Sequence, residues 1–213
     1  MSQRVLELGA GAGLVGVALA RAGARLVAAT DGSAEAVSNC AANLRLNLQQ
    51  HPVVECGQAC ELAALEQGVA VCRLAWEEPL PPGGVRFDSV VASDVLYDPE
   101  VVPVLVSLLD RLLRPEVSCE SGGAASSPAI SMSSGAAGGA HVAYIATLRR
   151  NPATLQLFLE TAAAAGLQVS PLDGWGDGAV SRVGGPHSAV RFHLGVLDDK
   201  SIAERIVIHR VTH

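Results

Sequence analysis

The sequence has few aromatic residues, and this scarcity limits how its core can be built. Phe, Trp and Tyr together make up 3% of the 213 residues, whereas hydrophobic residues as a whole reach 49%. An apolar interior must therefore be assembled mainly from Ala, Val and Leu side chains. A chain of this length is expected to form one domain, residues 1–213, with enough residues to bury a substantial core.

An excess of basic charge is also missing, and this argues against a broad nucleic-acid surface. The chain carries 15 Lys and Arg residues against 21 Asp and Glu residues, for a formal net charge of −6. Proteins bind phosphate backbones through basic fields. We therefore expect no direct nucleic-acid partner, and an acidic chain suits a basic partner or a small ligand better.

Paired cysteines and long apolar runs are absent as well. The five cysteines include no Cys-x-x-Cys pair, which predicts free thiols in a reducing compartment rather than disulfides or a zinc site. No uncharged apolar segment reaches the ~20 residues of a membrane span. Arg4 and Glu7 interrupt the apolar stretch that a signal peptide needs. We therefore expect a cytoplasmic monomer that binds no metal and no membrane.

Apolar runs alternate with amphipathic segments along most of the chain. Strands are predicted at 4–8, 26–30, 69–74, 87–92, 141–147, 167–170, 190–196 and 206–211. Helices are predicted at 13–22, 34–48, 99–115 and 152–165, with a short helical piece near 59–66. This alternation predicts an α/β fold with a doubly wound, mostly parallel sheet and an antiparallel C-terminal hairpin.

One segment differs in composition from everything around it. Residues 116–139 are rich in Ser, Gly and Ala and contain almost no large apolar side chain. Such a segment cannot bury enough apolar surface to offset its ordering entropy. We expect a flexible insertion within the single domain.

The first predicted strand ends in an acid and a cluster of glycines, the run Glu7–Gly13. Glycines let the backbone turn sharply and let a ligand approach it closely, and the free N–H groups of the next helix face the same space. The pattern Gly11-x-Gly13-x-x-Gly16 also matches the dinucleotide fingerprint. An acid just before the glycines suits a cationic ligand better than a pyrophosphate, so two classes of nucleotide ligand compete at this turn.

Two further polar positions follow predicted strands. Asp31 ends the second strand, where a carboxylate can accept both hydroxyls of a ribose, although it could instead cap the next helix. The run Ser93–Tyr97 follows the fourth strand. Ligands of such sheets bind outside the carboxyl ends of the strands, so this run is predicted to face the ligand. A simple turn with Tyr97 as packing is the alternative.

These motifs resemble one family. The run Glu7–Gly13 resembles motif I of the seven-strand S-adenosylmethionine methyltransferases, and Ala92–Tyr97 before a Pro-Glu helix resembles the protein-lysine methyltransferases of that class. The run Arg150–Phe158 is similar to lysine methyltransferases that act on eukaryotic elongation factor 2. The resemblance covers residues 4–115 and 141–170. It implies a seven-stranded Rossmann-like sheet, S-adenosylmethionine as cofactor, and elongation factor 2 as protein substrate.

The same resemblance implies roles for individual residues. Trp76 would lie against the adenine, because an indole face can stack on a purine. Asp94 and Tyr97 are implied as the catalytic residues that border the lysine entrance. Relatives carry Asp-Trp where this chain has Ala75-Trp76, so Glu77 or Glu78 would have to replace the missing carboxylate. The implied cofactor-binding residues are Glu7, Gly9, Ala10, Gly11, Gly13, Asp31, Trp76 and Ser93.

The resemblance also implies helical segments ahead of the first strand, with an aromatic residue that covers the cofactor. This sequence begins at that strand, so we expect these elements to be missing and one side of the pocket to be open. Two alternative functions therefore compete with that of a methyltransferase. They are an NAD-dependent oxidoreductase and a non-catalytic binding module with a methyltransferase fold.

Overall fold

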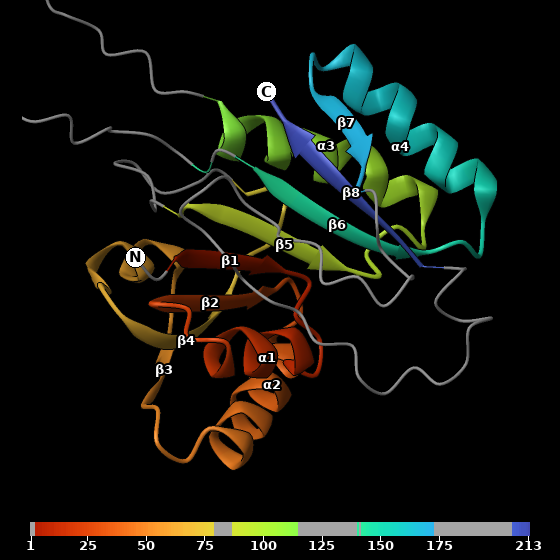
Figure 1. Ribbon diagram of the computed structural model, residues 1–213. Coiled ribbons are helices and arrows are strands. Elements are labelled where there is room, and N and C mark those ends of the chain that lie inside the picture. Colours follow the sequence, from red (N-terminus) through yellow and green to blue (C-terminus); the bar gives the residue numbers. More distant parts are fainter. Residues whose placement is uncertain (1–2, 79–86, 115–139, 141, 173–205) are drawn as a thin grey trace, which may run out of the picture.

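A single eight-stranded sheet organises the part of the chain that the computed structural model describes, residues 3–78, 87–114, 140, 142–172 and 206–213. Its strand order is β3-β4-β2-β1-β5-β6-β8-β7, so β1 lies near the centre (Figure 1). The strands are β1 (Arg4–Leu8), β2 (Leu26–Asp31), β3 (Val53–Cys56), β4 (Gly68–Arg73), β5 (Ser89–Ser93), β6 (Ala143–Leu148), β7 (Gln168–Pro171) and β8 (Ile206–Thr212).

The sheet is parallel apart from β8, the last strand in the sequence. Strands β3, β4, β2, β1, β5 and β6 pair in parallel, whereas β8 lies between β6 and β7 and runs antiparallel to both. This confirms the doubly wound α/β sheet with an antiparallel hairpin at its C-terminal end. The described strands number eight rather than the seven that the resemblance implied.

Strand β3 is the element that the sequence did not predict. It has four residues, and Val54 and Glu55 in its middle are exposed at the edge of the sheet. A short edge strand with exposed residues has neither an apolar run nor a clear alternation. The predicted strand 190–196 and the predicted insertion 116–139 lie outside the described residues.

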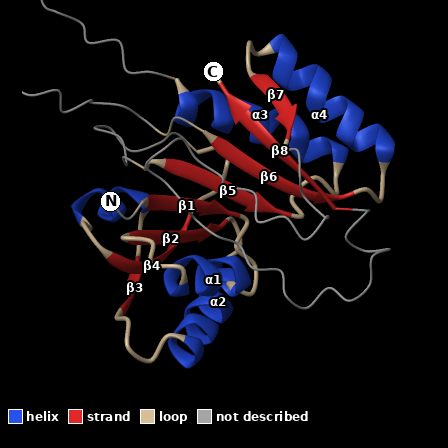
Figure 2. Ribbon diagram, viewed as in Figure 1, coloured by secondary structure: helices blue, strands red, loops and turns tan. Residues whose placement is uncertain are grey.

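Within the described residues, four α-helices cover the two faces of the sheet. Figure 2 shows α1 (Leu14–Arg21) and α2 (Ala34–Asn47) on one face, and α3 (Val102–Leu113) and α4 (Pro152–Ala164) on the other. Two 3₁₀ turns, η1 (Ala59–Ala64) and η2 (Pro99–Val101), complete the described elements. None of the described helices is both long and apolar enough to cross a membrane.

The side chains of β1 divide between the two cores because successive residues of a strand point to opposite faces. Val5 belongs to the core beneath α1 and α2, whereas Leu6 and Leu8 belong to the larger core beneath α3 and α4. Ala, Val and Leu supply most of both cores, as the scarcity of aromatics predicts. Two aromatic side chains also belong to the larger core, Phe87 and the fully buried Phe158 of α4.

Helix boundaries follow local sequence signals. The Ser33 hydroxyl accepts a hydrogen bond from the backbone N–H of Ala36 at 3.3 Å and begins α2, and the Asn151 side chain accepts from Ala153 N at 3.1 Å and begins α4. These bonds satisfy amides that have no partner inside the helix. Gly23 follows α1 with a φ of 86°, a conformation that glycine adopts without strain. The predicted helices 13–22, 34–48 and 152–165 agree with α1, α2 and α4 to within one residue at each end.

The buried ring of Phe158 gives a test of the larger core. Replacing Phe158 with Ala leaves a cavity, and we expect the free energy of unfolding to fall by about 3–5 kcal/mol. Leu46→Ala is the control, because Leu46 of α2 is 72% exposed and its truncation should change stability by less than ~0.5 kcal/mol. Urea denaturation measures both. Equal midpoints for the two variants would contradict the burial of Phe158.

Candidate functional site

The glycine turn joins the end of β1 to the start of α1 (Figure 1). Gly9, Gly11 and Gly13 have φ angles of 67°, 52° and 83°, in the left-handed region that favours glycine. A Cβ at Gly9 would lie 2.9 Å from Cγ1 of Val95, and one at Gly13 would lie 2.8 Å from Sγ of Cys40. A Cβ at Gly11 would meet no atom within 4 Å. Close packing therefore excludes side chains at Gly9 and Gly13, whereas Gly11 borders open space that a ligand could enter.

Asp31 ties this turn to the neighbouring strand β2. One carboxylate oxygen accepts a hydrogen bond from the backbone N–H of Gly11 at 3.0 Å, and the other accepts from the N–H of Ser33 at 3.0 Å. The backbone N–H of Ala10 also donates to the carbonyl of Thr30 at 2.8 Å. A carboxylate has about four acceptor positions, so Asp31 retains capacity for a ligand. The capping side chain of α2 is Ser33, so Asp31 is left to organise the turn.

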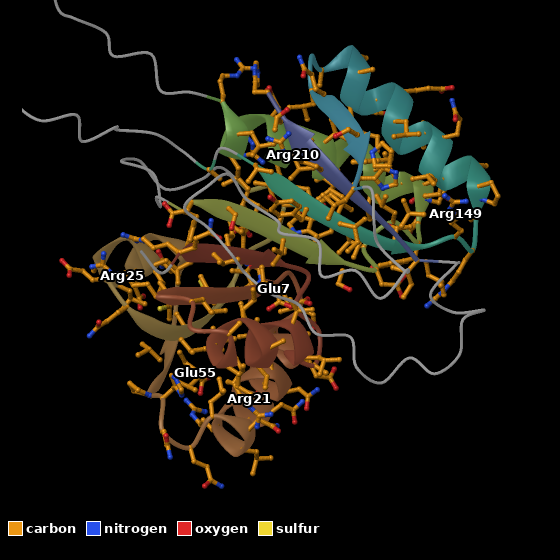
Figure 3. The ribbon with its side chains drawn as sticks, in the orientation of Figure 1. Glu7, Arg21, Arg25, Glu55, Arg149 and Arg210 are labelled. Atoms are coloured by element: carbon orange, nitrogen blue, oxygen red, sulfur yellow. The ribbon has the colours of Figure 1, made fainter. Side chains whose placement is uncertain are left out.

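Glu7 lies beneath the turn rather than on its surface. Its side chain points from the end of β1 toward α1, and the residue is 2% exposed (Figure 3). One oxygen, Oε2, is buried without a hydrogen-bond partner among the described residues, 3.1 Å from where a Cβ of Gly16 would lie.

This environment changes the ionisation of Glu7. Burial, with a smaller contribution from the charge of Asp31, raises the pKa of Glu7 from 4.5 to about 8, although the backbone N–H of Gly16 acts in the opposite direction. The raised pKa favours the protonated form of Glu7 at neutral pH. A cation bound nearby would favour its ionised form.

Trp76 brings the end of β4 to the same turn. Its indole Cζ2 lies 3.6 Å from where a Cβ of Gly9 would lie, and the partly buried side chain packs against the larger core. Glu78 pairs with Arg73 at 2.9 Å instead of pointing freely into the site, and Glu77 is exposed. The contacts of Gly9 with Trp76 and Val95 therefore join the ends of β1, β4 and β5 at one edge of the sheet.

The run Ser93–Tyr97 leaves β5 beside the turn. Ser93 is exposed, and Tyr97 is 67% exposed although it is aromatic. Asp94 has a φ of 57°, the one positive value among the described residues other than glycine. Its carboxylate pairs with the Arg150 guanidinium at 2.8 Å. Strained backbone of this kind is found most often at functional sites.

Arg150 joins this site although the sequence did not mark it as a site residue. It follows β6, which pairs with β5, and 56 positions separate it from Asp94. Its place in the run Arg150–Phe158 was the available signal, but sequence spacing does not show which residue it would contact.

In the part of the chain that the structure describes, no three His, Cys, Asp or Glu side chains gather as they would around a metal ion.

The fold and the glycine turn define a class of protein. The structure resembles that of a TehB-like SAM-dependent methyltransferase from Corynebacterium glutamicum, with a TM-score of 0.53 and 13% sequence identity over 99% of this chain and 80% of that chain. It also resembles the methyltransferase domain of bacterial CtHen1, with a TM-score of 0.55 and 11% identity over 99% and 90% of the two chains. The fold is the Rossmann-like fold of these methyltransferases.

Sequence similarity then assigns the family. Residues 1–122 match the lysine methyltransferase family. Because this match spans more than half of the 213 residues, the chain belongs to that family.

Three relatives share this family resemblance. Protein-lysine N-methyltransferase EFM3 of Chaetomium thermophilum is 32% identical over 79% of this chain and 42% of its own length. Protein-lysine N-methyltransferase EEF2KMT of Bos taurus is 32% identical over 76% and 45%, and protein N-lysine methyltransferase METTL21A of Danio rerio is 34% identical over 52% and 44%. The chain spans less than half the length of these curated relatives.

The buried acid predicts how stability depends on pH. The pKa of Glu7 is higher in the folded protein than in the unfolded chain, so folding favours the protonated acid. This stabilisation is complete below the unfolded pKa of 4.5 and is lost as the pH rises through about 8. We expect the free energy of unfolding to fall by up to about 1.4 kcal/mol per pH unit across that window.

A neutral replacement isolates the effect of Glu7. Glu7→Gln should remove most of this slope and stabilise the protein at the alkaline end, as measured by urea unfolding at a series of pH values. Glu66→Gln is the control, because the Glu66 side chain is 82% exposed. Identical slopes in the wild type and in Glu7→Gln would show that another group titrates.

Proposed function

We propose that this protein is an S-adenosylmethionine-dependent protein-lysine N-methyltransferase. The observation that carries the proposal is the construction of the turn after β1. Asp31 at the end of β2 binds the amide of Gly11, while Trp76 and Val95 pack against Gly9. Membership of the lysine methyltransferase family supports the same conclusion.

Four features of this turn fit the cofactor. The open space at Gly11 admits a ligand to the backbone, and the Asp31 carboxylate has acceptor positions left for two ribose hydroxyls. The partly buried Trp76 indole can stack on adenine. The Glu7 carboxyl, whose Oε2 has no hydrogen-bond partner among the described residues, lies beneath the turn, where it would favour a cationic ligand. We assign to the cofactor Glu7, Gly9, Ala10, Gly11, Gly13, Asp31, Trp76 and Ser93.

Methyl transfer to a lysine amine requires the protein mainly to align the amine with the methyl group and to exclude water. When bound, S-adenosylmethionine supplies the methyl group. A lysine amine has a pKa near ~10.4 and must lose its proton before it can attack. Entry into a desolvated channel lowers that pKa, and a fixed orientation of the amine lowers the barrier further.

We propose Asp94 and Tyr97 as the residues that receive the lysine. The Asp94 carboxylate would accept a hydrogen bond from the amine and orient it, and the exposed Tyr97 ring would form one wall of the entrance. Between Asp94 and Tyr97 in the sequence, the buried side chains of Val95 and Leu96 anchor this run to the core. Because Arg150 already pairs with Asp94, the incoming amine competes with the Arg150 guanidinium for the same carboxylate.

For the protein substrate we propose eukaryotic elongation factor 2. The run Arg150–Phe158 is similar to the corresponding run of enzymes that act on this factor, and the relative from Bos taurus bears the name EEF2KMT. Other relatives bear other names, so the substrate requires a direct test.

Cofactor binding is tested by titration calorimetry with S-adenosylhomocysteine. We expect the wild type to bind it and Asp31→Asn to bind it at least about tenfold more weakly, because one ribose acceptor is lost. Asp88→Asn is the matched control, since Asp88 accepts the N–H of Arg4 at the opposite end of β1. Folded wild type that gives no heat would overturn the proposal, and thermal stabilisation by NADH alone would favour the oxidoreductase.

Methyl transfer is tested by incubating recombinant elongation factor 2 with labelled S-adenosylmethionine. We expect incorporation with the wild type and about a hundredfold slower incorporation with Asp94→Asn, because the amine is no longer oriented. Binding of S-adenosylhomocysteine should be retained in that variant. Labelling of another protein instead would remove elongation factor 2 as substrate. Cofactor binding with no labelled protein at all would favour the non-catalytic binding module.

A further inference from the structure

Arg111 in the last turn of α3 reaches out of its own helix to the segment that carries Trp76. Its Nη2 donates a hydrogen bond to the carbonyl of Trp76 at 2.8 Å, and its Nη1 donates to the carbonyl of Glu78 at 3.0 Å. Its Nε donates to the carbonyl of Ser107, one turn back along α3, at 3.3 Å. Among the described residues its partners are thus backbone carbonyls, with no carboxylate.

These two contacts hold the turn that follows β4. The backbone N–H of Glu78 donates to the carbonyl of Ala75 at 3.1 Å, so residues 75–78 form a tight turn around Trp76. A guanidinium is planar and offers its donors in a fixed fork. Because the fork binds the carbonyls of Trp76 and Glu78 together, it fixes the peptide planes on which the direction of the Trp76 side chain depends.

We propose that Arg111 is a positioning residue for the cofactor site, which holds the Trp76 indole where adenine stacks. The inference rests on the proposed function, since it assumes that Trp76 receives adenine. Trp76 lies along the glycine turn, 3.6 Å from the Cβ position of Gly9, so a small rotation of its segment would move the ring away from the turn or against it. Arg111 itself touches no cofactor.

A neighbouring arginine shows that this role is not a general property of the helix end. Basic residues commonly lie near helix C-termini, where they interact with the last carbonyls and the helix dipole. Arg114 also lies at this helix end, but its guanidinium pairs with the Asp110 carboxylate of the same helix and, among the described residues, makes no hydrogen bond to the segment of Trp76. Arg114 therefore serves as a matched control of equal charge, three residues from Arg111.

The test uses Arg111→Met and Arg111→Lys. Methionine keeps an apolar stem without a donor, whereas lysine keeps the charge but cannot bind two carbonyls as a fork. Each is made in a Trp175→Phe background, which leaves Trp76 as the single tryptophan of the two in the chain. Binding of S-adenosylhomocysteine is followed by calorimetry and by the quenching of Trp76 fluorescence.

We expect Arg111→Met to raise the Kd for S-adenosylhomocysteine about tenfold, the size expected when a hydrogen bond from a charged group is lost, and to reduce the amplitude of Trp76 quenching. Arg111→Lys should recover part of both, and Arg114→Met should match the wild type. Adding Trp76→Ala to Arg111→Met should weaken binding little further, because both changes remove the same stacking contact.

The outcomes separate this inference from the proposed function. A wild type that binds S-adenosylhomocysteine, together with an unchanged Kd and full quenching in Arg111→Met, overturns the role of Arg111 and leaves the cofactor site in place. Additive losses from Trp76→Ala and Arg111→Met also overturn it. Absence of binding in the wild type overturns the cofactor site and the inference together. If Arg111→Met does not fold, the quenching amplitude of Arg111→Lys decides.

Discussion

The hydrogen bond from the Gly11 amide to the Asp31 carboxylate is the contact on which the site depends. It joins a turn after β1 to the end of β2, two strands that already pair along their length. With this bond made, the turn is held against its neighbouring strand while the space beside Gly11 stays open. A ligand can then meet backbone groups that are already in position, so little ordering is required on binding.

Close packing on the other side of the turn complements this bond. Gly9 lies so near Val95 that a Cβ at this position would clash, and Trp76 lies within van der Waals contact of the same Cβ position. The same closeness brings the ends of β4 and β5 to the end of β1, and parallel strands place all three at one edge of the sheet. The cofactor residues and the proposed lysine entrance at Asp94 therefore meet there, because the glycine turn is narrow enough to let them approach.

Burial of the Glu7 acid beneath the turn lowers the stability of the fold. Glu7 has an oxygen with no hydrogen-bond partner among the described residues, and burial raises its pKa to about 8. An apolar residue at this position would carry no desolvation penalty. A carboxyl group at this position suits a ligand that carries positive charge, since such a charge would favour ionised Glu7.

The sequence by itself determined the features that depend on local chemistry and on periodicity. Apolar runs alternating with amphipathic segments predicted the parallel sheet, the segments 34–48 and 152–165 predicted two of the helices, and the glycine cluster predicted the turn. Only the tertiary structure decided the short edge strand β3, the burial of Glu7, and the contacts of Arg150 and Arg111. The physical reason is that a strand without an apolar pattern is defined by the neighbour it pairs with. Likewise, a long charged side chain takes its partner from whichever segment the fold brings near, and sequence separation does not record that distance.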